Sequence, residues 1–321
     1  MSFYGIDNLK LTQLTDDALL CHQIKASSLF TCCDGLIIKP TKGHNNKTVI
    51  LDLNLEPQYI KQIYQDFGPV SDYVCSHTHL DHSAHVHVWE DLGVKIHVPQ
   101  QEHEHLLDHK ILLERFGFLE GVSLSTGEQF VKYNGFEKCK TVHPFQPGSI
   151  LDLDGLLVET KHFPGHSFGH VGFYIPSQKL FHISCLGFDQ PKPNIDGFGP
   201  WYGFKHNSIM QYLKDIDHAE SFFLNNAKIL TSSHSYVIKN PDKTPFEYMR
   251  RKIKENQEKV DNAFKSLGKP QISEDNAVNE LLKLDLFFPK HKLKDFLLEI
   301  FILWESWFIR NHIKRSKTIN F

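Results

Sequence analysis

Apolar and polar positions alternate in two different ways along the chain. Before about residue 243, short continuous apolar runs are separated by turn-rich loops, a pattern typical of strands buried on both faces. We interpret as strands the runs at 31–38, 48–53, 73–75, 94–98, 148–153, 156–160, 171–175, 179–185 and 227–234. Apolar residues at helical spacing predict helices at 57–67, 83–92 and 101–118, whereas 121–163 is expected to hold only short strands and turns.

The rest of the chain has a helical pattern. Helices are predicted at 245–267, 276–288 and 290–317. We therefore divide the chain into a domain at 1–243 and a helical C-terminal extension at 244–321. The last helix is densely apolar, but Glu299, Glu305 and Arg310 interrupt it and make it a poor membrane span. Such a helix needs a partner, and we expect its own chain to supply it; a homodimer through this helix, or a membrane surface, is the alternative.

Composition places the chain among ordinary globular proteins. It has 321 residues, 40% of them hydrophobic, and a net charge of −3, so no overall basic excess indicates nucleic-acid binding. The first residues lack the basic and apolar regions of a secretory signal, and the six cysteines lack the spacing of a disulfide framework. We therefore expect a cytoplasmic protein with reduced thiols and no transmembrane segment.

One short run, 76–82, carries the candidate chemistry. His77, His79, Asp81 and His82 closely follow an apolar run, and the end of a strand delivers side chains to a fixed point. Imidazole and carboxylate together suit zinc. His77 and His79, two apart on extended backbone, can face the same way, whereas the adjacent Asp81 and His82 diverge. This geometry predicts two metal ions side by side; a solvated loop in a chain with 21 histidines is the alternative.

This run resembles the HxHxDH signature of the metallo-β-lactamase superfamily, and the resemblance extends over about residues 30–238. It implies a four-layer αββα sandwich with a metal site at one edge. The segment 164–170 is similar to the PGHxxGH segment of the hydroxyacylglutathione hydrolase (glyoxalase II) and lactonase-like branch, in which a tight turn brings a histidine back to the metals.

The resemblance also implies a ligand set. His166 becomes the third histidine of the first metal, and His234 completes the second. Asp52 matches an aspartate that orients the metal loop, although it is also placed to cap a helix. The predicted metal ligands are His77, His79, Asp81, His82, His166, Asp189 and His234.

The sequence departs from the family pattern at the bridging ligand. An aspartate is expected at the end of the strand at 179–185, but Ser184 and Cys185 stand there and the first carboxylate is Asp189. We favour Asp189, reaching the metals through a bulge. Two alternatives stay open: Cys185 supplies a thiolate, which zinc accepts readily, or the bridge is absent.

The predicted reaction is hydrolysis by a metal-bound hydroxide, with two zinc ions per chain and iron or manganese as substitutes. Asp81 is the expected catalytic residue, because it can also receive the proton of the nucleophile. A small-molecule thioester, lactone or related ester or amide is the expected substrate, and Trp201 and Tyr202 either wall the substrate pocket or pack in the core. A phosphodiesterase or nuclease, and a degenerate non-catalytic metal-binding module, are the alternatives.

Overall fold

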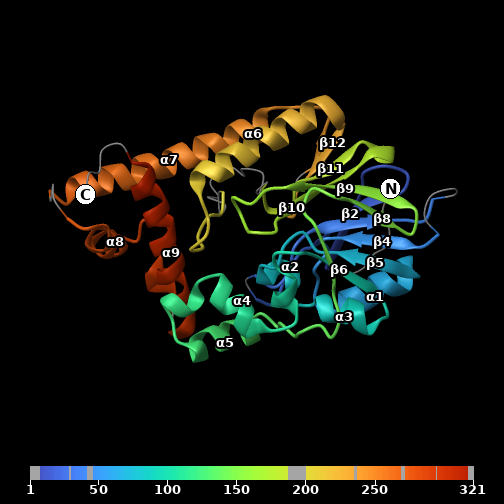
Figure 1. Cartoon of the computed structure of the whole chain (residues 1–321), viewed down its shortest axis with the longest axis horizontal. Coiled ribbons are helices and arrows are strands. Elements are labelled where there is room, and N and C mark those ends of the chain that lie inside the picture. The colour runs from blue at the N-terminus through green and yellow to red at the C-terminus, as the bar shows by residue number, and fades with distance from the viewer. Residues whose placement is uncertain are drawn as a thin grey trace.

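Two β-sheets pack face to face, and helices cover the outer face of each sheet (Figure 1). The computed structural model describes residues 8–28, 30–41, 46–186, 200–234, 237–268, 272–293 and 295–316. This architecture confirms the α+β class and the αββα sandwich that the resemblance implied.

Within the described residues the first sheet has seven strands, in the order β1 to β7. Their bounds are Leu9–Gln13, Ala18–Gln23, Gly35–Ile38, Thr48–Leu51, Val70–Val74, Lys95–Pro99 and His143–Phe145. Strands β1 to β4 pair antiparallel, and β4 to β7 pair parallel. A parallel arrangement brings the carboxyl ends of β4, β5 and β6 to one edge, which is where the metal-binding run leaves β5.

The second sheet has the order β13-β12-β11-β10-β9-β8. In chain order from β8 to β13, its strands are Ile150–Leu153, Leu156–His162, Val171–Ile175, Leu180–His182, Ile229–Thr231 and Val237–Lys239. The pair β11 and β12 is parallel and the other pairs are antiparallel. Strands β11 and β12 therefore end at the same edge, where Cys185 and His234 follow them.

The core lies between the sheets and under the helices. Apolar side chains of the two sheets interdigitate, among them Leu36 and Leu51 from the first and Val171 and Phe173 from the second. Helices α1 (Pro57–Phe67) and α3 (Val86–Asp91) cover the first sheet, and α6 (Ile209–Asn226) covers the second (Figure 1). The Trp89 ring of α3, for example, stacks on Tyr73 of β5 at 6.1 Å between centroids.

Several predicted helices differ in the structure. The helix expected at 83–92 is two short helices, α2 (Leu80–Ser83) and α3. The helix expected at 101–118 is broken, because Asp108 caps a new helix, α4 (His109–Arg115), by accepting a hydrogen bond from Lys110, and Gly117 ends it in a left-handed conformation.

The stretch 121–163 was expected to contain no helix, and that was wrong. Helix α5 (Leu124–Tyr133) begins there with the Ser123 hydroxyl accepting from the Thr126 backbone N–H. Its interior contains Thr126 and Gly127, which are poor helix formers. Packing against the C-terminal helix offsets this low propensity, and the Thr126 hydroxyl donates to Glu299 at 2.9 Å.

The C-terminal extension consists of α7 (Thr244–Ser266), α8 (Glu274–Leu282) and α9 (Asp295–Arg315). Helix α9 runs from beside α5 up to α7, and its apolar residues Ile300, Phe301 and Trp304 join the core of the sandwich (Figure 1). The expectation that this helix packs on its own chain is confirmed. No helix in the described ranges is long and apolar enough to cross a membrane. Pairing of two chains through α9 remains a prediction.

Truncation after Asn240 is expected to give an insoluble or aggregating protein. Removal of α9 uncovers Phe118 and Phe130, whose rings lie 6.2 and 5.5 Å from Trp304, and removal of α7 uncovers Phe223. A newly exposed apolar surface of this kind drives association. Size-exclusion chromatography of the soluble fraction checks this, and a soluble, monomeric and fully active truncation would contradict it.

Candidate metal centre

The run that carries most of the predicted ligands is held where β5 ends. The Ser76 backbone N–H donates to Asp52 Oδ1 at 3.0 Å, and its carbonyl accepts from Val171 of the second sheet at 3.0 Å. These bonds fix the run between the two sheets. His79 then lies at the N-terminal end of α2, so that Asp81 and His82 fall in the first turn of this helix.

Three histidines form a first group of candidate metal-binding atoms. His77 Nε2 lies 3.0 Å from His79 Nδ1 and 3.1 Å from His166 Nε2. Burial, together with the neighbouring imidazoles, holds the pKa of both His77 and His79 well below the ordinary value. Each ring is therefore neutral at pH 7 and offers a lone pair. The structure thus brings together the predicted ligands of the first metal.

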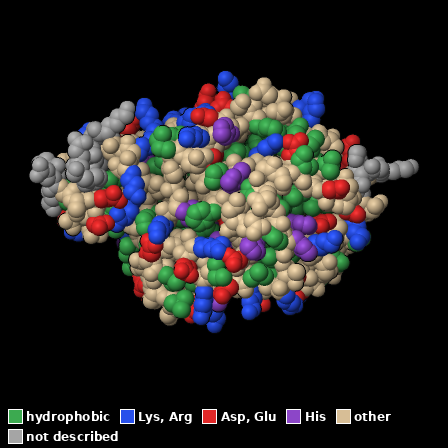
Figure 2. Space-filling view, in the orientation of Figure 1, with side chains coloured by type: hydrophobic (Ala, Val, Ile, Leu, Met, Phe, Trp, Pro, Cys, Tyr) green, Lys and Arg blue, Asp and Glu red, His purple; other side chains and the backbone are tan. Residues whose placement is uncertain are grey.

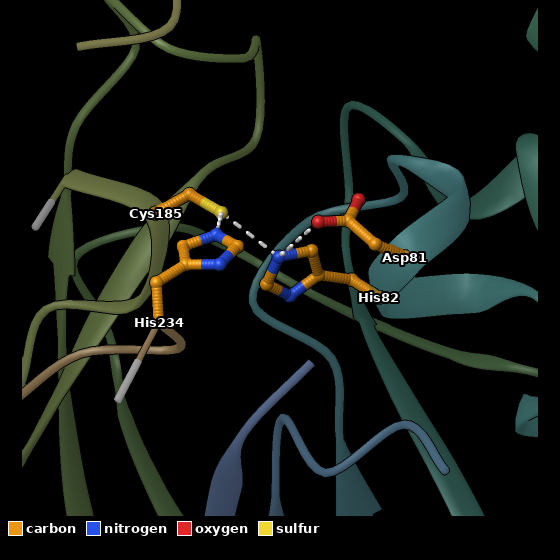
Figure 3. A group of neighbouring side chains, drawn as sticks. All are labelled: Asp81, His82, Cys185 and His234. Carbon is orange, nitrogen blue, oxygen red and sulfur yellow. Dashed lines mark hydrogen bonds and ion pairs between the residues drawn. The ribbon is translucent and has the colours of Figure 1, made fainter. Parts of the chain in front are cut away.

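A second group contains Asp81, His82, Cys185 and His234, which point toward one another (Figure 3). Cys185 Sγ lies 2.9 Å from His82 Nε2 and 3.0 Å from His234 Nε2. Asp81 Oδ2 lies 3.5 Å from His82 Nε2. The histidines and Asp81 were predicted as ligands; Cys185 was the open alternative, and its sulfur lies between the two imidazoles.

Electrostatics favours the thiolate form of Cys185. Burial by itself would raise the pKa of the thiol, but the imidazoles of His82 and His234 hold it well below the ordinary value. Burial also opposes ionisation of Asp81, and His82 nevertheless lowers the pKa of that carboxyl. The second group therefore presents anionic sulfur and oxygen beside imidazole nitrogen.

Asp52 holds residues of the second group in place through hydrogen bonds, which is the orienting role that the resemblance implied for it. Its Oδ2 accepts hydrogen bonds from His82 Nδ1 at 3.0 Å and from the hydroxyls of Ser184 and Ser233 at 2.7 and 2.9 Å. His82 is a member of the second group, and Ser184 and Ser233 directly precede its members Cys185 and His234. Although Asp52 is fully buried, which alone raises its pKa, His82 and His182 hold that pKa well below the ordinary value. One carboxylate therefore fixes the orientation of ligands from both sheets.

Glu102 ties the two ligand-bearing loops together, and no motif in the sequence marked it. This fully buried carboxylate accepts from the Thr78 backbone N–H at 2.7 Å and from its hydroxyl at 2.9 Å. Its other oxygen accepts from the Ser167 hydroxyl at 2.5 Å and the Gly169 N–H at 2.7 Å. Thr78 adjoins His77 and His79, and Ser167 follows His166, so Glu102 sets the distance between the histidines of the first group.

Glu102→Gln is expected to lower the free energy of unfolding by roughly 2–3 kcal/mol, because an amide donor would face hydrogen-bond donors in a buried site. Chemical denaturation measures this. Glu104→Gln is the matched control: that side chain is 39% exposed and pairs with Arg115, so its loss should cost about 1 kcal/mol at most. Equal effects of the two substitutions would contradict the role assigned to Glu102.

The residues present fit metal ions. Two sets of side chains each bring their ligand atoms within 4.8 Å of one another. One set is Asp81, His82, Cys185 and His234, and the other is His77, His166 and Cys185. The imidazole nitrogens His79 Nδ1 and His166 Nε2 each lie about 3 Å from His77 Nε2, a spacing that suits ligands of one ion. Asp189, the predicted bridging ligand, lies outside the described residues and stays a prediction.

A cavity of about 110 Å³ lies over both groups. His79, His166, Cys185 and His234 contribute to its lining. Trp201 also lines it, in agreement with the pocket-wall interpretation of that residue, and its carbonyl lies 3.0 Å from His166 Nδ1. For Tyr202 the interpretation as a core residue is right.

Tyr202 packs in the core and takes no part in the cavity. It is fully buried, and its hydroxyl lies 2.8 Å from His312 Nε2 and 3.1 Å from Asn256 Nδ2. Tyr202 thus joins the segment between Cys185 and His234 to the C-terminal extension.

Comparisons with known proteins agree with this architecture. Residues 38–222 match the family described as the metallo-beta-lactamase superfamily. Among solved structures, a metallo-beta-lactamase family protein from Thermus thermophilus is similar, with a TM-score of 0.62 and 16% identity over 94% of this chain and 93% of that one. A beta-lactamase domain protein from Burkholderia ambifaria has a TM-score of 0.62 and 14% identity over 95% and 88% of the two chains.

A shorter match is the metallo-beta-lactamase from Pontibacter korlensis, with a TM-score of 0.51 and 17% identity over 75% of this chain and 96% of that one. At these identities the similarity concerns the fold. The matches that cover 94% and 95% of the chain must include most of the C-terminal extension. No curated protein matched the chain.

Proposed function

Because this chain belongs to the metallo-beta-lactamase superfamily, we propose that it is a zinc-dependent hydrolase of small esters, thioesters or lactones. The observation that carries the proposal is the convergence of two ligand groups at the wall of one cavity. His77, His79 and His166 would hold the first zinc ion, and the second group, Cys185 included, would hold the second. Iron or manganese could replace zinc in such sites.

When bound, zinc would lower the pKa of water toward 7 and so provide a nucleophile, and it would polarise the scissile carbonyl. The chain itself orients the reactants. Asp81, whose lowered pKa keeps it ionised, lines the cavity and is placed to accept the proton that the nucleophile gives up. Asp52 and Glu102, which lie behind the ligands, hold the two groups in position.

The face of the molecule shown in Figure 2 favours a small-molecule substrate over a nucleic acid. On the face shown in Figure 2, Lys and Arg side chains are interspersed with Asp and Glu and form no continuous basic channel. A nuclease binds its substrate largely through such cationic surface.

Metal analysis combined with a substrate panel tests the proposal. The purified protein is expected to contain about two zinc ions per chain and to hydrolyse a simple thioester or lactone. A chelator should abolish turnover and added zinc should restore it. Metal binding without turnover of any thioester, lactone, β-lactam or phosphodiester would instead indicate a non-catalytic module. Cleavage of the phosphodiester alone would indicate the nuclease class.

A further inference from the structure

The C-terminal helix α9 supplies part of the wall of the cavity over the metal groups. Trp304 of this helix lines the cavity together with Phe30, Phe118, Phe130 and Phe204, so that much of the cavity wall is aromatic. The Trp304 ring lies 5.2 Å from Phe30 and 6.1 Å from Phe204, and Phe204 in turn lies 4.4 Å from the ring of the ligand His79. Trp304, which is more than 200 positions from His79 in the sequence, is thus separated from this ligand by a single ring, that of Phe204.

Trp304 also carries a hydrogen-bond donor that the described part of the chain leaves unused. Its side chain is almost completely buried, with 3% of the residue exposed. The indole Nε1 has no acceptor within hydrogen-bond distance among the described residues. A buried N–H group without a partner costs free energy, and in native proteins such a group is usually satisfied by water or a ligand.

Apart from the metal ions proposed for the two ligand groups, the described lining of the cavity offers no cation. None of its described lining residues is Lys or Arg. Asp81 is the carboxylate in the lining. Burying an unpaired charge against the aromatic rings is costly.

The size of the cavity limits what can enter it. At about 110 Å³ it is smaller than an apolar cavity of about 150 Å³, which is known to bind benzene. An apolar group that enters it without movement of the walls is therefore no larger than a single ring or a short acyl chain.

We propose that the substrate is an uncharged ester, thioester or lactone with a compact apolar group of about phenyl size, and that Trp304 selects it. The aromatic wall takes the apolar group, and the Trp304 indole N–H donates to an oxygen of the substrate. Helix α9 is then a specificity element that completes the active site. The hydrolysis of this substrate rests on the proposed hydrolase function, whereas its binding in the cavity does not.

Binding is tested with 1-phenylpropan-2-one, a neutral ketone that resembles phenyl acetate but cannot be hydrolysed. Calorimetric titration of the zinc-loaded protein should show one site per chain. Trp304→Phe keeps a ring but removes the N–H donor, and should weaken binding about three- to tenfold. Trp307→Phe is the matched control, because Trp307 lies on the same helix, also has an Nε1 without a described acceptor, and does not line the cavity. Thermal melting confirms that both variants are folded.

Kinetics of the wild-type protein provide an independent test. Phenyl acetate and methyl phenylacetate place the ring on either side of the scissile bond, and each is compared with its para-carboxylate derivative. In the series that is hydrolysed, the added charge should lower kcat/KM at least about 100-fold. Trp304→Phe should raise KM for the neutral ester more than it lowers kcat.

The outcomes separate the two proposals. Ketone binding that is weakened by Trp304→Phe, without hydrolysis of any ester, would retain the binding pocket and reject the hydrolase function. Hydrolysis that tolerates the para-carboxylate and is indifferent to Trp304→Phe would retain the hydrolase function and overturn the role of Trp304. Equal weakening of ketone binding by Trp304→Phe and Trp307→Phe would also overturn it.

Discussion

Cys185→Ala is expected to reduce bound zinc from about two ions per chain to about one and to lower activity at least about 100-fold. The sulfur lies 2.9 Å from His82 Nε2 and 3.0 Å from His234 Nε2, so its removal takes the central ligand out of the second group. The first group keeps its three imidazoles, and the remaining zinc should stay bound there. Plasma mass spectrometry for zinc and a thioester or lactone assay measure the two effects.

Two further substitutions show whether this result is specific to Cys185. Cys139→Ala is the matched control, because Cys139 is also buried but belongs to neither ligand group, and it should keep both zinc ions. Asp189→Ala examines the carboxylate favoured from the sequence. If Asp189 supplies the bridge, Asp189→Ala loses one zinc ion while Cys185→Ala is almost silent, which is the reverse of the pattern expected from the position of the sulfur.

Asp52→Ala is expected to destabilise the protein by about 3–5 kcal/mol and to weaken zinc binding at the second group about 10- to 100-fold. The carboxylate is fully buried and accepts hydrogen bonds from His82, Ser184 and Ser233, all of which lose their partner. Denaturant unfolding of the metal-free protein gives the first quantity, and competition with a zinc chelator gives the second.

A partly buried Asp–His pair elsewhere in the first sheet provides the control for Asp52. Asp72 Oδ1 lies 2.8 Å from His97 Nε2, and neither residue touches the ligand groups. Asp72→Ala should reduce stability while leaving zinc affinity unchanged. If Asp52→Ala behaved in the same way, Asp52 would stabilise the fold without orienting the ligands.

The sequence predicted the parts of the centre that are local. His77, His79, Asp81 and His82 fall in one short run after a buried strand, so their types and spacing alone indicated metals. His166 and His234 come from distant segments, and only the resemblance to a family connected them to that run. The place of Cys185 depends on the short helical turn Ser184–Leu186 after β11, which spacing along the chain does not fix.

The features that escaped prediction are those decided by tertiary contacts. Glu102 bonds to residues 24 and 67 positions away, and a buried glutamate has no sequence signature of its own. Helix α5 contains weak helix formers and exists because α9 packs on it. Trp304 fitted the general expectation of an apolar helix that needs a partner, but its position in the cavity wall follows only from the folded arrangement.

Cobalt titration of the metal-free protein tests the central claim most directly, because cobalt(II) reports on its ligands by its absorption spectrum and commonly replaces zinc. We expect about two equivalents to bind, with a thiolate-to-cobalt charge-transfer band that is absent from Cys185→Ala. Binding of a single equivalent, or two equivalents without the thiolate band, would contradict a second metal site built around Cys185.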